Sequence, residues 1–185
     1  MFEQFIIVNS GTNIYYDIGT PTANPDFQGA SLGTFTTSGS LLLGGQGKSF
    51  KNNSSDVTGM RLFYRVWQGS PGGSFNQFNY TFQSNLGTGP SPDFSVNQQW
   101  GSDVAGSNGT AFYTGNLLTG LATGTWNLEV FSQITTNGVN ATNPISNNNG
   151  TANFTATFGV VPEPSRSLLL FAGVAAMLVR RRRVG

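Results

Sequence analysis

Alternation of mainly apolar and mainly polar side chains over short segments most limits what this chain of 185 residues can fold into. In residues 60–67 the even-numbered side chains are Met, Leu, Tyr and Val. They fall on one face of an extended chain, because successive strand side chains point to opposite faces. Three other segments alternate in the same way: residues 78–82, 126–133 and 154–158. No helical periodicity occurs before residue 168, so we predict β-strands at these four segments.

Weaker alternation and turn-forming clusters extend this pattern along the chain. Five weaker candidate strands lie at residues 13–17, 32–35, 40–43, 94–96 and 111–113. Clusters rich in Gly, Asn, Ser and Pro, which favour turns, lie at residues 44–47, 70–73, 87–90 and 147–150. Many short strands with such punctuation predict an all-β fold, an antiparallel β-sandwich that is either Ig-like or jelly-roll-like. We expect this body to be one domain over residues 1–160.

Composition excludes several kinds of chemistry. The chain has no cysteine and no histidine, which removes disulfides, thiolate metal sites and the commonest general base. Before Pro162 there are four basic and seven acidic side chains, and this negative balance argues against a nucleic-acid partner. Only 9% of all residues are charged, which suits a turn-rich exported protein. We therefore predict no catalytic residue, no cofactor and no metal, and a protein that is not an enzyme.

The acids of the body offer little for catalysis or metal binding. Most lie near Gly, Pro, Asn or Ser, where Asp commonly forms turns, and we expect Glu129, on the more polar face of its strand, to be solvated. Calcium prefers oxygen ligands, and the similar strings at residues 24–27 and 91–94 contain Pro-Asp-Phe. Without EF-hand spacing, these strings are better interpreted as two turns.

Aromatic side chains allow a different hypothesis, because their rings can stack on sugars. We expect Trp126 to be a core residue, since it lies on the apolar face of its strand. Trp67 and Trp100 lie in more polar surroundings and are the freer candidates. An alternative function is therefore that of a carbohydrate-binding module or a hydrolase that acts on exopolysaccharide.

The last part of the chain differs from the body. Residues 168–179 are uncharged and apolar, and as a helix they rise about 18 Å, less than the roughly 30 Å of a bilayer core. Flanking serines can lengthen the segment and arginines can snorkel to the interfaces, so we predict a single C-terminal transmembrane helix. The residues expected to lie in the span are Leu168, Leu169, Leu170, Phe171, Val174, Met177, Leu178 and Val179.

Four consecutive arginines follow the apolar segment. Arg180, Arg181, Arg182 and Arg183 fit the positive-inside rule as a cytoplasmic anchor, which would leave the body outside the cytoplasm. A solvated basic tail and a contact with nucleic acid are the other interpretations of such a run. The nucleic-acid interpretation requires a cytoplasmic β protein whose first residue is Met1.

The string Val161-Pro162-Glu163-Pro164, followed by the apolar segment and the arginines, resembles the PEP-CTERM sorting signal of Gram-negative bacteria. The resemblance covers residues 161–185 and no more of the chain. It implies export through the inner membrane and processing by an exosortase, with Pro162, Glu163 and Pro164 as the residues recognised. It also implies transit in the inner membrane with a periplasmic body, a final place at the cell surface or in the extracellular matrix of a biofilm, and exopolysaccharide as a partner.

An N-terminal export signal is the missing part of this pattern. The first residues, MFEQFIIVNSG, have no basic stretch, contain Glu3 and carry a short apolar run at residues 5–8. We expect the true start to lie upstream of Met1, the alternative being a truncated gene product.

Overall fold

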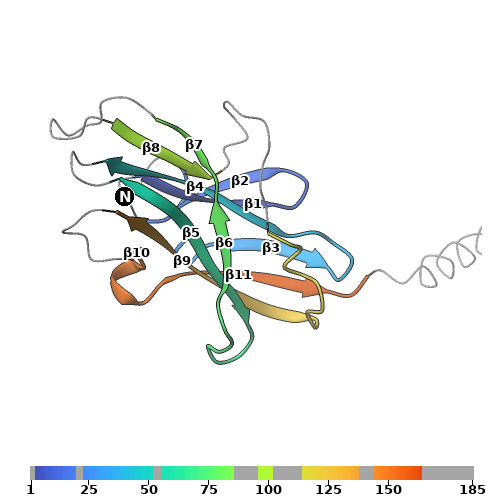
Figure 1. The fold of residues 1–185 in the computed structure, drawn as a ribbon. Coiled ribbons are helices and arrows are strands. Elements are labelled where there is room, and N and C mark those ends of the chain that lie inside the picture. The colour runs from blue at the N-terminus through green and yellow to red at the C-terminus, as the bar shows by residue number, and fades with distance from the viewer. Residues whose placement is uncertain are drawn as a thin grey trace, which may run out of the picture.

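The computed structural model describes residues 3–19, 23–51, 56–85, 96–101, 114–137 and 144–163. These residues form two β-sheets that pack against each other (Figure 1). The described residues contain a 3₁₀ turn at Asn149–Thr151 and no α-helix. The prediction of an all-β, sandwich-like fold is therefore confirmed.

One sheet has five strands in the order β2-β1-β4-β8-β7, and the other has six, with the path β3-β11-β9-β5-β6 and β10 paired to β9. The five-stranded sheet contains β1 (Glu3–Asn9), β2 (Asn13–Asp17), β4 (Leu42–Lys51), β7 (Phe82–Asn85) and β8 (Val96–Gly101). The six-stranded sheet contains β3 (Ser31–Thr36), β5 (Val57–Trp67), β6 (Asn76–Tyr80), β9 (Gly124–Thr136), β10 (Ile145–Asn147) and β11 (Phe154–Val161). Among the named strand pairs, all are antiparallel except β11 with β3.

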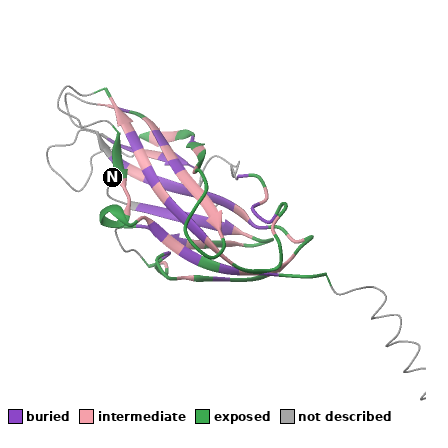
Figure 2. Ribbon diagram, turned by 90° about the horizontal axis from the view of Figure 1, so that it is seen from below, coloured by how far each residue is buried: buried purple, intermediate pink, exposed green. Residues whose placement is uncertain are grey.

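The core lies between the sheets and follows the predicted alternation. Buried residues alternate with more accessible ones along all of β11, over residues 60–63 of β5 and over residues 130–135 of β9, and banded strands are visible in Figure 2. Leu62, Leu128 and Ala156 are fully buried, one from each of these strands. Trp126 packs against the same core and donates its indole N–H to the carbonyl of Ala122 at 2.9 Å, which agrees with its predicted core position.

The segment at residues 78–82, predicted as one strand, is divided between the two sheets. Tyr80 ends β6 and pairs with Met60, whereas Phe82 begins β7 and pairs with Trp100 of the other sheet. Between them, the carbonyl of Thr81 accepts a hydrogen bond from the Gly101 amide at 2.8 Å. The chain thus turns a corner of the sandwich here, and strands that change sheets at a corner are a known feature of packed sheets.

The glycine cluster at residues 44–47, predicted as a turn, lies inside β4. A side chain on Gly45 would overlap the Tyr80 hydroxyl, and one on Gly47 would overlap the Met60 sulfur. Both obstacles come from the facing sheet, so these glycines let the sheets approach closely. The turn prediction was wrong because it relied on the conformational freedom of glycine. At these positions glycine is needed for its small volume.

The C-terminal predictions extend beyond the described residues. Pro162 and Glu163 are described, while Pro164, the predicted span at residues 168–179 and the four arginines lie outside the described residues, as do residues 87–90 and 111–113. Among the residues that the structure does describe, no helix combines the length and the apolar character needed to cross a membrane.

Candidate functional site

Strand β11 positions the first two residues of the predicted sorting motif at one end of the six-stranded sheet. Its inward side chains, such as Phe158 and Val160, are buried and fix the strand in the sandwich. The parallel pairing with β3 continues to its last residue, Val161, whose carbonyl accepts a hydrogen bond from the Thr37 amide at 3.0 Å. Pro162 and Glu163 follow directly and are exposed.

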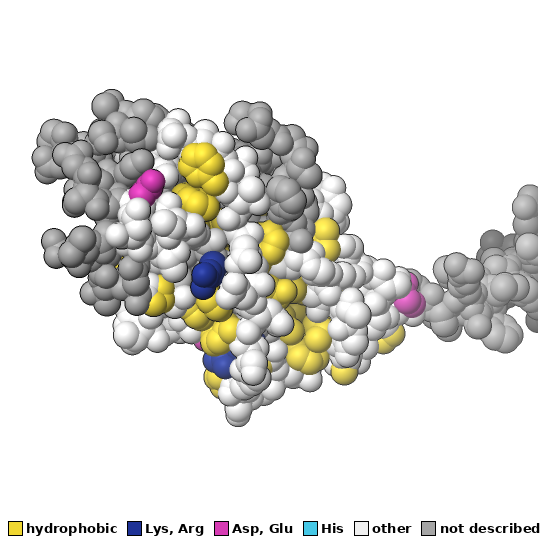
Figure 3. All heavy atoms as spheres, viewed as in Figure 1, with side chains coloured by type: hydrophobic (Ala, Val, Ile, Leu, Met, Phe, Trp, Pro, Cys, Tyr) yellow, Lys and Arg dark blue, Asp and Glu magenta, His cyan; other side chains and the backbone are white. Residues whose placement is uncertain are grey.

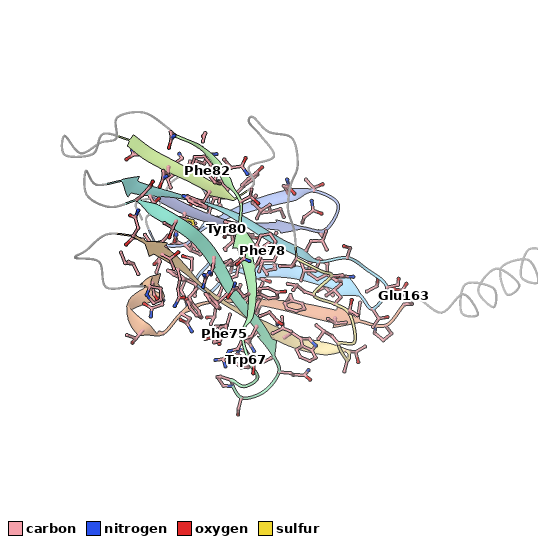
Figure 4. All side chains as sticks on the ribbon, viewed as in Figure 1. Trp67, Phe75, Phe78, Tyr80, Phe82 and Glu163 are labelled. Atoms are coloured by element: carbon pink, nitrogen blue, oxygen red, sulfur yellow. The ribbon has the colours of Figure 1, made fainter. Side chains whose placement is uncertain are left out.

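Glu163 is bound by the turn that follows β3. Its Oε1 atom accepts hydrogen bonds from the Ser38 backbone N–H, at 2.9 Å, and from the Ser38 hydroxyl. Figure 4 places Glu163 just beyond the end of β11, beside the end of β3 and away from the labelled aromatic residues. The carboxylate of the motif is therefore attached to the body and does not extend freely from it.

These donors affect the charge state of Glu163. Hydrogen bonds from the Ser38 hydroxyl, the Thr36 side chain and the Ser38 amide lower the pKa of the Glu163 carboxyl, because they favour its ionised form. Glu163 remains exposed to solvent, so water competes with each of these contacts. The arrangement fixes the position of a charged group and leaves it accessible.

The 36–39 turn is built independently of Glu163. The Gly39 amide donates to the Thr36 carbonyl at 2.9 Å, and the Gly39 carbonyl accepts from the Asn116 side-chain amide at 2.8 Å. The Asn116 side-chain oxygen also accepts from the amide of Leu41, which is fully buried. The turn is thereby tied to the core. Sequence reasoning singled out Glu163 but missed Ser38, which lies 125 residues earlier and has no local motif.

A second cluster of interacting polar groups lies on the outer face of the six-stranded sheet, around Glu129. The Glu129 Oε2 atom accepts from Arg65 Nε at 2.8 Å and from the Trp67 indole N–H at 3.2 Å, and its Oε1 atom accepts from Asn153 Nδ2 at 2.6 Å. Only 5% of Glu129 is exposed. The expectation that Glu129 is solvated was wrong, because these donors replace the water that a strand-face carboxylate would otherwise bind.

Aromatic rings cover part of the same face. Phe63 and Phe131, directly opposite each other on β5 and β9, stack with ring centroids 4.8 Å apart. Phe75, from the loop before β6, contacts Phe131 edge-on at 5.0 Å and lies under the Arg65 guanidinium, 4.4 Å from ring centroid to Cζ. On the side of the molecule viewed in Figure 3, hydrophobic side chains gather beside basic groups. These rings contact one another, so the cluster resembles a small accessory core.

The Glu129 cluster has the character of a structural site. The carboxylate is paired with Arg65, whose Nη2 lies 2.7 Å from Oε2, and both of its oxygens already accept hydrogen bonds. A general acid or base needs a free lone pair or proton directed at a substrate. The described contacts instead tie the 68–75 loop to the sheet, because Arg65 also donates to the Gly73 carbonyl at 3.1 Å.

The other predicted candidates lie in different environments. Trp100 is 8% exposed and packs within the core, so the expectation that it is free was wrong. Trp67 is half-buried, with its indole N–H bound to Glu129. In the 24–27 string, the Asn24 side chain donates to the Asp17 carboxylate at 3.0 Å and Asp26 forms an isolated parallel bridge with Asp17, so the string pairs with the end of β2. The 91–94 string lies outside the described residues. Across the described part of the chain, no group of three or more acidic residues is placed to hold a metal ion.

Comparisons with protein families, with curated proteins and with solved structures find no match to this chain.

Proposed function

We propose that this is an exported, non-enzymatic protein of the cell surface or extracellular matrix, routed by a membrane sorting signal of the PEP-CTERM kind. The observation that carries the proposal is the succession of Pro162-Glu163-Pro164, an uncharged segment at residues 168–179 and four arginines. In this proposal an exosortase recognises the motif while residues 168–179 form a helix in the inner membrane. The described geometry supports it in one respect, since β11 ends directly before the motif and leaves Pro162 and Glu163 exposed.

The proposal that the body is not an enzyme draws support from two of its described acids. Glu129 is engaged by Arg65, Trp67 and Asn153, and the Asp17 carboxylate accepts from Asn24. A body without catalysis acts through its folded surface, as a component of a surface layer or matrix. We propose that its sandwich is Ig-like or jelly-roll-like, which is compatible with this role, although fold alone does not determine function.

Fractionation of the exporting cell tests the proposal. The full chain is compared with a variant that lacks residues 162–185 and with a control that lacks only Val184 and Gly185. We expect the full chain and the control in membrane and extracellular material, and the deletion variant as a soluble protein in the periplasm. The same distribution for all three proteins would refute the proposal.

Glycan binding is a second candidate function, and one observation favours it. The Trp67 indole is half-buried on the outer face, near Phe75 in Figure 4, and a partly accessible aromatic ring can stack on a sugar. Affinity electrophoresis in gels that contain exopolysaccharide tests this function. Trp67→Ala should abolish the retardation of the protein in the gel. The control is Phe82→Ala, which removes a ring of the other sheet that is 43% exposed, and it should leave the retardation unchanged. Equal retardation of both variants and the unmodified chain would exclude Trp67 as a ligand contact.

A further inference from the structure

The contact between Ser38 and Glu163 joins two parts of the chain that are 125 residues apart in sequence. A tail that extended freely from the body would not make this contact. Ser38 uses both of its donors, the backbone N–H and the hydroxyl, on the same carboxylate oxygen. Hydrogen bonds to a charged acceptor are stronger than those between neutral groups. The turn is thus specifically complementary to a carboxylate at this position.

The geometry of β3 and β11 determines where that carboxylate lies. Parallel pairing aligns Val161 with Thr36, and the hydrogen bond from the Thr37 amide extends the alignment by one residue. Proline fixes its own φ, so Pro162 limits the directions that the next residue can take. Glu163 reaches Ser38 for this reason, without a flexible linker between the core strand and the motif.

The turn is held by contacts that do not involve Glu163. Its internal hydrogen bond from Gly39 to Thr36 and its attachment to Asn116 involve no atom of the motif. A rigid receptor of this kind loses little conformational freedom when the carboxylate docks. By contrast, Glu163 is solvent-exposed, so water competes with the turn for its carboxylate.

We propose that the 36–39 turn regulates the sorting motif, because it competes with the processing enzyme for the carboxylate of Glu163. This inference rests on the proposed function, in which the motif is recognised by an exosortase. The enzyme can bind Glu163 only in molecules where the contact with Ser38 is open. When a binding-competent state is only partly populated, apparent affinity falls in proportion to that population. The folded body therefore slows processing to a moderate extent, without blocking it.

A processing assay tests the inference on the full chain in membranes that contain an exosortase. The rate of tail removal is measured by intact mass for the unmodified protein, Ser38→Ala, Ser38→Thr and Ser40→Ala. Ser40 is an exposed serine two residues further along, which makes it a matched control. We expect Ser38→Ala to accelerate processing about two- to fivefold, since it removes one donor and leaves the backbone N–H. Ser38→Thr, which keeps the hydroxyl, and Ser40→Ala should match the unmodified rate.

A fifth variant separates failure of this inference from failure of the proposed function. Glu163→Ala should abolish or strongly slow processing if the motif is recognised at all. If Glu163→Ala is processed normally, the proposed function fails and the inference fails with it. If Glu163→Ala is impaired while Ser38→Ala has the unmodified rate or a slower one, the proposed function stands and regulation by the turn is refuted.

Discussion

The two glutamates that the structure surrounds with donors lie in opposite physical environments. Glu129 is buried on the outer face of the six-stranded sheet and is bound by Arg65, Trp67 and Asn153. Glu163 is exposed beyond the end of β11 and is bound by Ser38. The same chemical group therefore has two different environments in one molecule.

Burial is the difference between these two environments. A buried carboxylate cannot recover its lost hydration from water, so its protein donors are indispensable and the site stabilises the fold. An exposed carboxylate exchanges protein donors for water at little cost, so its contact is reversible and contributes little to stability. Glu129 is thus suited to holding the body together, and Glu163 is accessible to the processing enzyme that the proposed function requires.

The largest effect that separates the two environments is expected from Glu129→Ala. The change leaves the Arg65 guanidinium, the Trp67 indole N–H and the Asn153 amide without their acceptor, and we expect a loss of about 3 kcal/mol in the free energy of unfolding. Urea denaturation measures it. The matched change Glu163→Ala should leave the unfolding midpoint unchanged, and similar losses for both variants would remove the distinction.

A double variant sharpens the interpretation of the Glu129 cluster. Replacing both charges together, as Arg65→Met with Glu129→Leu, leaves neither member of this ion pair without its partner, and such replacements are often far less harmful than removal of one partner. We expect the double variant to be more stable than Glu129→Ala alone by at least about 1 kcal/mol. If the double variant is the less stable of the two, the ion pair is not the dominant interaction of Glu129.

A smaller effect is expected at Asn153, which donates to Glu129 and has a φ of 57°. Asn153→Ala loses the hydrogen bond and places an unfavourable residue in the left-handed region, so we expect a loss of about 2 kcal/mol in unfolding free energy. Asn153→Gly tolerates that backbone and should lose about 1 kcal/mol, from the hydrogen bond alone. Equal stability of Asn153→Gly and the unmodified protein would show that Asn153 contributes only its backbone conformation.

The smallest effect on stability is expected at Glu163. It is detected as a change in the pKa of the Glu163 carboxyl. Because its donors are present only in the folded state, the pKa of Glu163 in the folded protein is lower than in the unfolded chain. The slight stabilisation is therefore complete above the unfolded pKa and disappears as pH falls through the folded pKa. Side-chain carboxyl NMR should show the pKa of Glu163 rising in Ser38→Ala and staying constant in Ser40→Ala. A constant pKa in both variants would contradict the contact.

Much of the six-stranded sheet was predictable from alternation alone. The segments at residues 60–67, 126–133 and 154–158 became β5, β9 and β11, since each has one face toward the core and the other toward solvent. The weaker segment at residues 32–35 lies within β3 of the same sheet, and the one at residues 13–17 is β2 of the five-stranded sheet. A strand with one face in the core and one more accessible face has apolar residues on the first and polar residues on the second. This alternation is visible in the sequence, which is why these predictions are confirmed.

The five-stranded sheet was harder to predict, for physical reasons. In β1 the consecutive residues Phe5, Ile6, Ile7 and Val8 are all buried, so the strand has no alternation that sequence analysis can detect. In β4, the glycines that leave room for Tyr80 and Met60 look like a turn-forming cluster in the sequence.

The environment of Glu129, on β9 of the other sheet, was also not predictable. Glu129 looked solvated because its strand face is otherwise polar, and its partner Asn153 lies 24 residues away in sequence. Contacts of this kind depend on which strands become neighbours, and local sequence does not specify that.

The most direct test compares Glu129→Ala and Glu163→Ala in one experiment that measures both the unfolding free energy and the destination of each protein in the exporting cell. We predict a crossed result. Glu129→Ala should be destabilised yet reach the destination of the unmodified chain wherever it folds, and Glu163→Ala should be as stable as the unmodified chain but remain unprocessed in the membrane. A Glu163→Ala protein that reaches the normal destination, or that loses stability as Glu129→Ala does, would contradict the account.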